Sequence, residues 1–253
     1  MSVLNKKILN PLINDWPAGA VYLTSWLNKR GISNQLLDRY KKSAWLQSIG
    51  TGALIRSGDQ ASYEGAVFAL QTQSDSAIHP GAKTALAMLG KAHYLQLSNV
   101  KAILFGGATD RLPAWVNNAD WKVAIDYYGS SFLPPKLGLV DLELKTFSIQ
   151  VSSPARAIME CLYLAPEKQE LSECHELMEG LTNLRPQQVQ ALLEACTSVK
   201  VKRLFLFLAE KAKHDWFEYL DLTKIDLGKG KRSVVPNGVL NTKYQITVPK
   251  ELA

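Results

Sequence analysis

The chain has 253 residues, of which 47% are hydrophobic and 21% are charged, a composition that excludes a disordered protein and a length that predicts two globular domains. Its net charge of +6 lies within residues 1–58, where eight basic residues stand against two acidic ones, so the rest of the chain sums to zero. We expect no export signal and no membrane span, because the apolar stretch after Lys7 is interrupted at Asn10 and Pro11 and the run Leu204–Ala209 is far shorter than the ~20 residues that cross a bilayer.

Two short helices are predicted in the basic N-terminal segment. Thr24–Lys29 forms the first, and Gly31 stands where a left-handed residue ends a helix. Ser33 is a candidate N-cap for a second helix over Asn34–Ala44, since its hydroxyl can accept a backbone N–H that a helix start leaves unpaired. Two helices joined by a glycine-containing turn are typical of helix-turn-helix DNA readers.

The second of these helices separates an apolar from a polar face at 100° per residue. Its apolar arc must pack on a core and comprises Leu36, Leu37, Tyr40 and Ala44. The opposite arc and its flanks carry side chains that can pair with base edges or hold phosphates. These are Asn34, Gln35, Asp38, Arg39, Lys41 and Lys42. An amphipathic surface helix without a partner would show the same pattern.

A hairpin is predicted directly after this helix. Leu46–Ile49 and Ala53–Arg56 form two short strands about a glycine-rich turn at residues 50–52, where winged helix-turn-helix domains carry their wing. Trp45 is expected to fill the core beneath the hairpin, with Thr51 at the tip and Arg56 at the base. The predicted DNA-binding residues are therefore Ser33, Asn34, Gln35, Asp38, Arg39, Lys41, Lys42, Thr51 and Arg56.

The second half of the chain is predicted to hold strands first and helices afterwards. A buried strand is expected at Val100–Phe105, and a pair of strands follows at Leu139–Leu144 and Phe147–Val151. Ser153 and Pro154 mark the N-cap and first residue of a helix. Later elements are two helices at 185–197 and 201–213 and a hairpin that turns at Asn237-Gly238.

A weak boundary near residues 90–99 divides these two groups of elements. We expect an α+β protein with a winged helix-turn-helix domain over residues 1–92 and a larger mixed α/β domain over residues 93–253.

Several strings in the chain resemble the AbiEi antitoxins of type IV toxin–antitoxin systems, a group linked to abortive phage infection. The first domain carries YLTSWLNKRGIS, LLDRYKKSAWLQSIGTGALIRSGD, YEGAVFAL and IHPGAKTALAMLG. The second carries LPAWV, SSPARAIMECLYL, KRLFLFLAEK, DLTKIDLGKGKR and KYQITVP. Together the strings span nearly the whole chain.

The resemblance implies a repressor of its own operon whose C-terminal domain counters a toxin encoded beside it. In that family the toxin is a nucleotidyltransferase-like protein, and the antitoxin acts without a stable toxin complex. The expected partners are thus operator DNA and, functionally, that toxin, in the cytoplasm and without a membrane. We expect no enzymatic activity. A transcriptional regulator without any toxin is a further alternative.

The sharpest enzymatic alternative is a metal-dependent nuclease. Asp141, Glu143 and Lys145 alternate along one predicted strand, and Asp126 could supply the upstream acid that such enzymes use to hold Mg²⁺. Exposed charges on an edge strand explain the pattern equally well.

We expect no metal and no cofactor. The four histidines show no i, i+4 pair, and Cys161, Cys174 and Cys196 lack close spacing, which predicts reduced thiols. Cys174-His175 is expected to be a surface pair. The basic run at residues 228–232 lacks the spacing of a phosphate loop and is interpreted as a solvated surface or a contact to flanking DNA.

Overall fold

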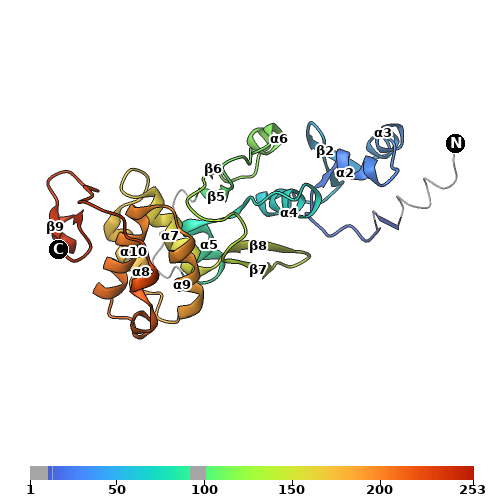
Figure 1. Cartoon of the computed structure of the whole chain (residues 1–253). Coiled ribbons are helices and arrows are strands. Elements are labelled where there is room, and N and C mark those ends of the chain that lie inside the picture. The colour runs from blue at the N-terminus through green and yellow to red at the C-terminus, as the bar shows by residue number, and fades with distance from the viewer. Residues whose placement is uncertain (1–10, 13, 92–100) are drawn as a thin grey trace. The chain divides into compact units, whose positions relative to one another are not determined.

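The fold was analysed in a computed structural model that describes residues 11–12, 14–91 and 101–253. The protein is α+β and divides into two compact units (Figure 1). Unit 1 comprises residues 1–79, 100–129 and 141–150, and unit 2 comprises residues 80–99, 130–140 and 151–253. No helix in the described residues is long and apolar enough to cross a membrane.

Unit 1 begins with the two helices and the hairpin that the sequence predicts. The elements in chain order are β1 (Tyr22–Leu23), α2 (Thr24–Lys29), α3 (Asn34–Lys42), β2 (Leu46–Gly50) and β3 (Ala53–Arg56). The three strands form one antiparallel sheet in the order β1-β3-β2, so the hairpin is joined to the strand that precedes α2.

The core of this part is built from the apolar sides of the same elements. Trp16, Leu27, Ile32 and Leu46 are almost fully buried, and Trp16 donates its indole N–H to the Ala20 carbonyl at 2.7 Å. Leu36 and Leu37 of α3 join this cluster, with Tyr40 packed at its edge. The predicted apolar arc of α3 is therefore confirmed for these three residues.

Helix α4 (Tyr63–Gln73) lies against the free edge of β1. The Gln73 side chain accepts from the Leu23 amide at 2.7 Å and donates to the Val21 carbonyl at 2.9 Å. One side-chain amide thus supplies the hydrogen bonds that a neighbouring strand would otherwise make to this edge of β1. Gly65 allows this packing because a Cβ there would lie 2.1 Å from the Gly19 carbonyl oxygen.

The remainder of unit 1 is a small sheet with a short helix. Strands β5 (Ala102–Gly106) and β6 (Ile125–Gly129) are parallel, and the chain between them forms α6 (Ala114–Asn118). Strand β5 also borders β4 (His79–Pro80). The predicted buried strand is thus confirmed at 102–106, and Val100 lies outside the described residues.

The predicted strand pair after residue 138 is also confirmed. Strands β7 (Leu139–Glu143) and β8 (Ser148–Ser152) form a two-stranded sheet. On the unit 1 side of this hairpin, the Gln150 amide donates to Gln71 of α4 at 2.8 Å.

Unit 2 is mainly helical. Its helices are α5 (Ala82–Met88), α7 (Pro154–Leu164), α8 (Leu171–Glu179), α9 (Pro186–Ala195) and α10 (Val199–Lys211). After α10 the described residues form short 3₁₀ helices at Asp215–Tyr219, Leu222–Lys224 and Lys250–Leu252. The last of these follows a hairpin of β9 (Val239–Asn241) and β10 (Ile246–Val248). The predicted helix starts at Pro154 and Pro186 are confirmed, and Ser153 caps α7 by accepting from the Arg156 amide.

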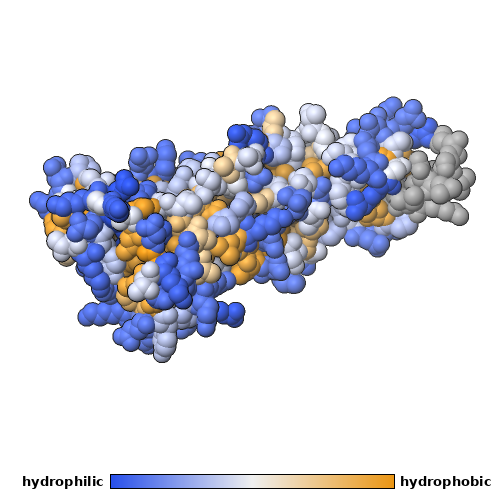
Figure 2. Space-filling view, in the orientation of Figure 1, coloured by the Kyte–Doolittle hydropathy of each residue, from blue (hydrophilic) through white to orange (hydrophobic). Residues whose placement is uncertain are grey.

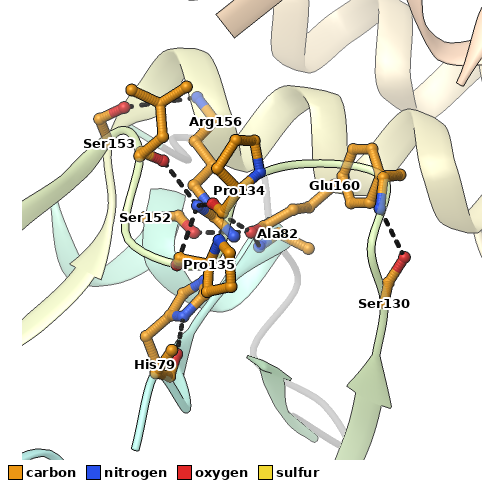
Figure 3. Close-up of polar contacts among 12 residues, drawn as sticks. His79, Ala82, Ser130, Pro134, Pro135, Ser152, Ser153, Arg156 and Glu160 are labelled. Atoms are coloured by element: carbon orange, nitrogen blue, oxygen red, sulfur yellow. Dashed lines mark hydrogen bonds and ion pairs between the residues drawn. The ribbon is translucent and has the colours of Figure 1, made fainter. Parts of the chain in front are cut away.

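A buried ion pair in unit 2 holds the start of α7. Arg156 donates to Glu160 at 2.8 Å, and the other carboxylate oxygen of Glu160 accepts from Ser152 at 2.8 Å and from the Ala82 amide at 2.9 Å (Figure 3). The guanidinium also donates to the carbonyls of Pro134, Pro135 and Leu137. Both charged side chains are almost completely buried, so each depends on these partners.

The predicted end of α3 and the predicted turn of the last hairpin are wrong. Helix α3 ends at Lys42 rather than Ala44, which has a positive φ of 55° and is exposed. The last hairpin turns at residues 242–245, because Ile246 pairs with Asn241 and the Asn241 side chain accepts from the Tyr244 amide at 2.9 Å. Asn237, with a φ of 56°, lies in a separate bend before β9.

The three cysteines are free and buried, so the interpretation of Cys174-His175 as a surface pair is wrong for the cysteine. Burial raises the pKa of Cys174 to about 12 and the pKa of Cys161 well above its ordinary value. At neutral pH these thiols therefore stay protonated and react poorly as nucleophiles. We expect all three thiols of the native protein to resist a disulfide reagent that reacts at once after unfolding.

A Thr51→Cys variant supplies the control, since residue 51 is exposed. It should react rapidly with one equivalent of reagent. Rapid reaction of all three thiols in the unsubstituted native protein would contradict the burial of these cysteines.

Candidate nucleic-acid interface

The turn between α2 and α3 fixes how α3 is presented. Gly31 has a φ of 82°, which ends α2 in the left-handed region that glycine tolerates. Ser33 caps α3 through its hydroxyl oxygen, which accepts from the Leu36 amide at 3.3 Å. The predicted turn and cap are both confirmed.

The polar face of α3 is directed away from the core. Its exposed residues are Asn34, Gln35, Asp38, Arg39, Lys41 and Lys42. Leu36 and Leu37 are buried on the other side. In the face that Figure 2 shows, hydrophilic residues cover the surface over α3. The structure thus brings the helical residues of the predicted site together on one outward surface.

The electrostatics of this surface are dominated by its C-terminal half. Lys41 pairs with Asp38 at 2.7 Å, and the hydrogen bond from Lys41 together with its charge lowers the pKa of the Asp38 carboxyl. The pair cancels one positive charge. Arg39 and Lys42 are exposed basic residues of the last turn, where a positive charge interacts favourably with the helix dipole.

The hairpin tip is exposed and fixed to the helices. Thr51 and Gly52 form its turn, and Gly52 has a φ of 82°. The Thr24 amide at the start of α2 donates to the Gly52 carbonyl at 2.9 Å. The tip is therefore linked to the same pair of helices that presents the polar face of α3.

Arg56 lies at the base of the hairpin, as predicted, but its guanidinium has partners within the protein. It pairs with Asp59 at 3.2 Å and donates to the Trp16 carbonyl at 3.3 Å. These contacts tie the end of β3 to the segment before β1. A DNA contact by Arg56 stays a prediction, as it does for the other eight residues.

Trp45 does not fill the core, because 54% of its surface is exposed. Its ring packs edge-on against Tyr40 at 6.2 Å between centroids and borders a shallow cavity with Asn14, Arg56 and Ser57. The physical reason is alternation along the chain. Leu46 points into the core, so its neighbour must point outward. This exposed aromatic ring beside α3 is a candidate contact that the sequence prediction missed.

Two of the three acidic residues in the nuclease alternative, Asp126 and Asp141, contact other side chains. Asp126 pairs with Lys101 at 3.3 Å on β6, and Asp141 accepts from Gln150 at 3.3 Å. Glu143 and Lys145 are exposed. Within residues 11–12, 14–91 and 101–253, no three His, Cys, Asp or Glu side chains are grouped so that they could hold a metal ion.

The basic run at residues 228–232 is shaped by a buried arginine. Arg203 donates to the carbonyls of Leu227, Gly230, Gln245 and Gly228 at 2.7–3.2 Å. The side chains of Lys229, Lys231 and Arg232 are exposed. The loop is thus a cationic surface held from inside by backbone carbonyls.

Two family models cover the chain. Residues 5–97 match the N-terminal domain of AbiEi antitoxin transcriptional regulators, and residues 99–249 match the model described as transcriptional regulator, AbiEi antitoxin, type IV toxin–antitoxin system. A comparison with curated proteins found no match. The arrangement of an N-terminal and a larger C-terminal part fits these two models.

Among solved structures, the chain is similar to the RV2827C protein from Mycobacterium tuberculosis. The TM-score is 0.61 at 12% sequence identity, over 97% of this chain and 91% of the other. At that identity the likeness establishes a shared fold alone. The two family models, by contrast, extend over nearly all of the sequence. The chain therefore belongs to the family of AbiEi antitoxins, the transcriptional regulators of type IV toxin–antitoxin systems.

Proposed function

We propose that the chain represses its own operon by binding operator DNA with α3 and the β2–β3 hairpin, and that it counters a nucleotidyltransferase-like toxin encoded beside it. In this proposal residues 1–92 are the winged helix-turn-helix domain and residues 93–253 are the antitoxin domain. The protein acts in the cytoplasm, without catalysis and without a stable complex with the toxin.

One observation carries the DNA-binding part of the proposal. The outward face of α3 is polar and basic, and α3 is followed by a hairpin in a sheet of order β1-β3-β2. That order of helix, helix and hairpin suits a module that places one helix in the major groove and the hairpin tip on the adjacent backbone. Asn34 and Gln35 are exposed at the start of α3 and can pair with adenine edges. Arg39 can pair with guanine.

The antitoxin part of the proposal rests on family membership. The family model that matches residues 99–249 is described as an antitoxin of a type IV system. We infer that the neighbouring gene encodes the toxin.

Footprinting of the full-length protein on the DNA upstream of its gene tests the repressor role. We expect protection of paired half-sites, since a single winged module reads few base pairs and two copies would be needed for specificity. Lack of any protected segment at low salt, where phosphate contacts are strongest, would overturn the assignment.

A growth assay tests the antitoxin role independently. Expression of the neighbouring gene alone should arrest growth, and co-expression of this chain should restore it. A chain that protects the upstream DNA but never restores growth would be a regulator without a toxin.

A further inference from the structure

Strand β2 of the proposed wing lies at the edge of its sheet. In the order β1-β3-β2, β3 is held between two strands, whereas β2 has one strand partner, β3, among the residues that the structure describes. The register between them shifts between Ser48 and Gly50, so the ladder is interrupted next to the tip. An edge strand whose ladder is interrupted has few hydrogen bonds to hold its end, and a wing must have a fixed position to contact a defined phosphate.

Strand β2 is also supported by α6, a helix that lies outside residues 5–97, the segment that the N-terminal family model matches. Helix α6 contacts β2 within unit 1. The two elements are neighbours in Figure 1. At the contact, a Cβ added to Gly50 would lie 2.7 Å from the Cβ of Trp115 and 3.2 Å from its Cα. Gly50 has no positive φ in the structure, so its missing side chain serves this close approach rather than a special backbone conformation.

Trp115 is itself firmly held. Only 7% of its surface is exposed, and its ring packs edge-on against Trp121 at 6.2 Å between centroids. Trp121 donates its indole N–H to the Val116 carbonyl at 2.6 Å, which joins α6 to the segment that leads into β6. The side of α6 that contacts the hairpin is therefore held in place by its own packing.

Both sides of the hairpin turn are consequently fixed. Gly50 precedes Thr51 and rests on Trp115, and Gly52 follows Thr51 and accepts from the Thr24 amide of α2. The first contact comes from α6 and the second from the helix pair that presents α3. Thr51 lies between them.

We propose that Trp115 is a positioning residue for DNA binding, which sets where the tip at Thr51 meets the DNA backbone. The DNA-reading module then extends past residue 92 and includes α6. This inference rests on the proposed operator binding by α3 and the hairpin. It predicts that DNA affinity responds to a residue that never touches DNA.

A cleaving probe on the tip tests the inference. The natural cysteines are buried, so Thr51→Cys in the full chain provides a single reactive thiol for an iron chelate that cuts nearby DNA. With the wild-type Trp115 we expect cuts at one defined position in each half-site. In Trp115→Leu, the cuts should spread or vanish and operator affinity should fall roughly tenfold, while methylation protection by α3 persists.

Three further variants separate positioning from general destabilisation. Trp216→Leu is the matched control, because Trp216 is a buried tryptophan of unit 2 and its loss should leave the cutting pattern unchanged. Trp115→Phe keeps a ring against the hairpin and should restore the pattern. Should Trp115→Leu not fold, Gly50→Ala adds one methyl group at the same contact and should displace the cuts.

The outcomes also distinguish this inference from the proposed function. Defined cuts that stay unchanged in both Trp115→Leu and Gly50→Ala would overturn the positioning role and leave operator binding intact. A parent Thr51→Cys protein that binds operator DNA but cuts it nowhere would instead remove the hairpin from the interface. A parent protein that binds no upstream DNA would overturn the proposed function itself.

Discussion

Replacement of both Arg39 and Lys42 with alanine should weaken operator binding on the order of 100-fold at physiological salt. Both side chains are exposed on the outward face of α3, and each contact to a base edge or phosphate contributes about 1–3 kcal/mol. If both meet phosphates, the slope of log affinity against log salt should also fall by about 2. A gel-shift or anisotropy titration at several salt concentrations measures both quantities.

The matched control removes the same charge elsewhere. Lys168 and Lys211 are exposed residues of unit 2, and their double alanine variant also lowers the net charge by two. We expect that variant to bind nearly as well as the parent protein. Equal losses in the two double variants would mean that net charge rather than the face of α3 governs binding, and an unchanged affinity in the first would remove Arg39 and Lys42 from the site.

The parts of the fold that the sequence predicted are those fixed by short-range chemistry. Gly31 ends α2 and Ser33 caps α3, because a left-handed backbone and an unpaired amide each favour a particular residue type. Ser153 before Pro154 starts α7 for the same reason. The outward face of α3 follows from helical periodicity and from nothing beyond the helix itself.

The errors arise where a local pattern was extended past its limit. Helical periodicity placed Ala44 on the apolar face, but α3 ends two residues earlier and Ala44 adopts a positive φ. Strand β2 then begins at Leu46, whose side chain is buried, and the ring of the preceding Trp45 is turned outward. Hydrophobicity alone therefore misplaced it.

Contacts between distant segments could not be predicted from the sequence. The glycine-rich turn was recognised as a turn, yet the need for glycine at position 50 comes from Trp115, 65 residues further along. The same holds for the contact of Arg56 with the Trp16 carbonyl, which precedes β1 and becomes a neighbour only when β3 has paired with β1.

Glu160→Ala is expected to destabilise the protein by about 3–5 kcal/mol, the usual cost of breaking a buried ion pair from one side. The substitution leaves the Arg156 guanidinium, itself 3% exposed, without its carboxylate and removes the acceptor of the Ala82 amide. Both groups would stay buried, so water cannot replace the lost partner. Urea unfolding monitored by circular dichroism measures the change in the free energy of unfolding.

Two comparisons show whether this loss comes from the buried pair. Lys101→Ala breaks an exposed ion pair with Asp126 and should cost less than about 1 kcal/mol. Glu160→Ala should cost less in an Arg156→Ala background than in the parent protein, because the unpaired charge is then absent. Equal costs in the two backgrounds would show that Arg156 and Glu160 act independently, and the loss would then have to arise from the contacts of Glu160 with Ser152 and Ala82.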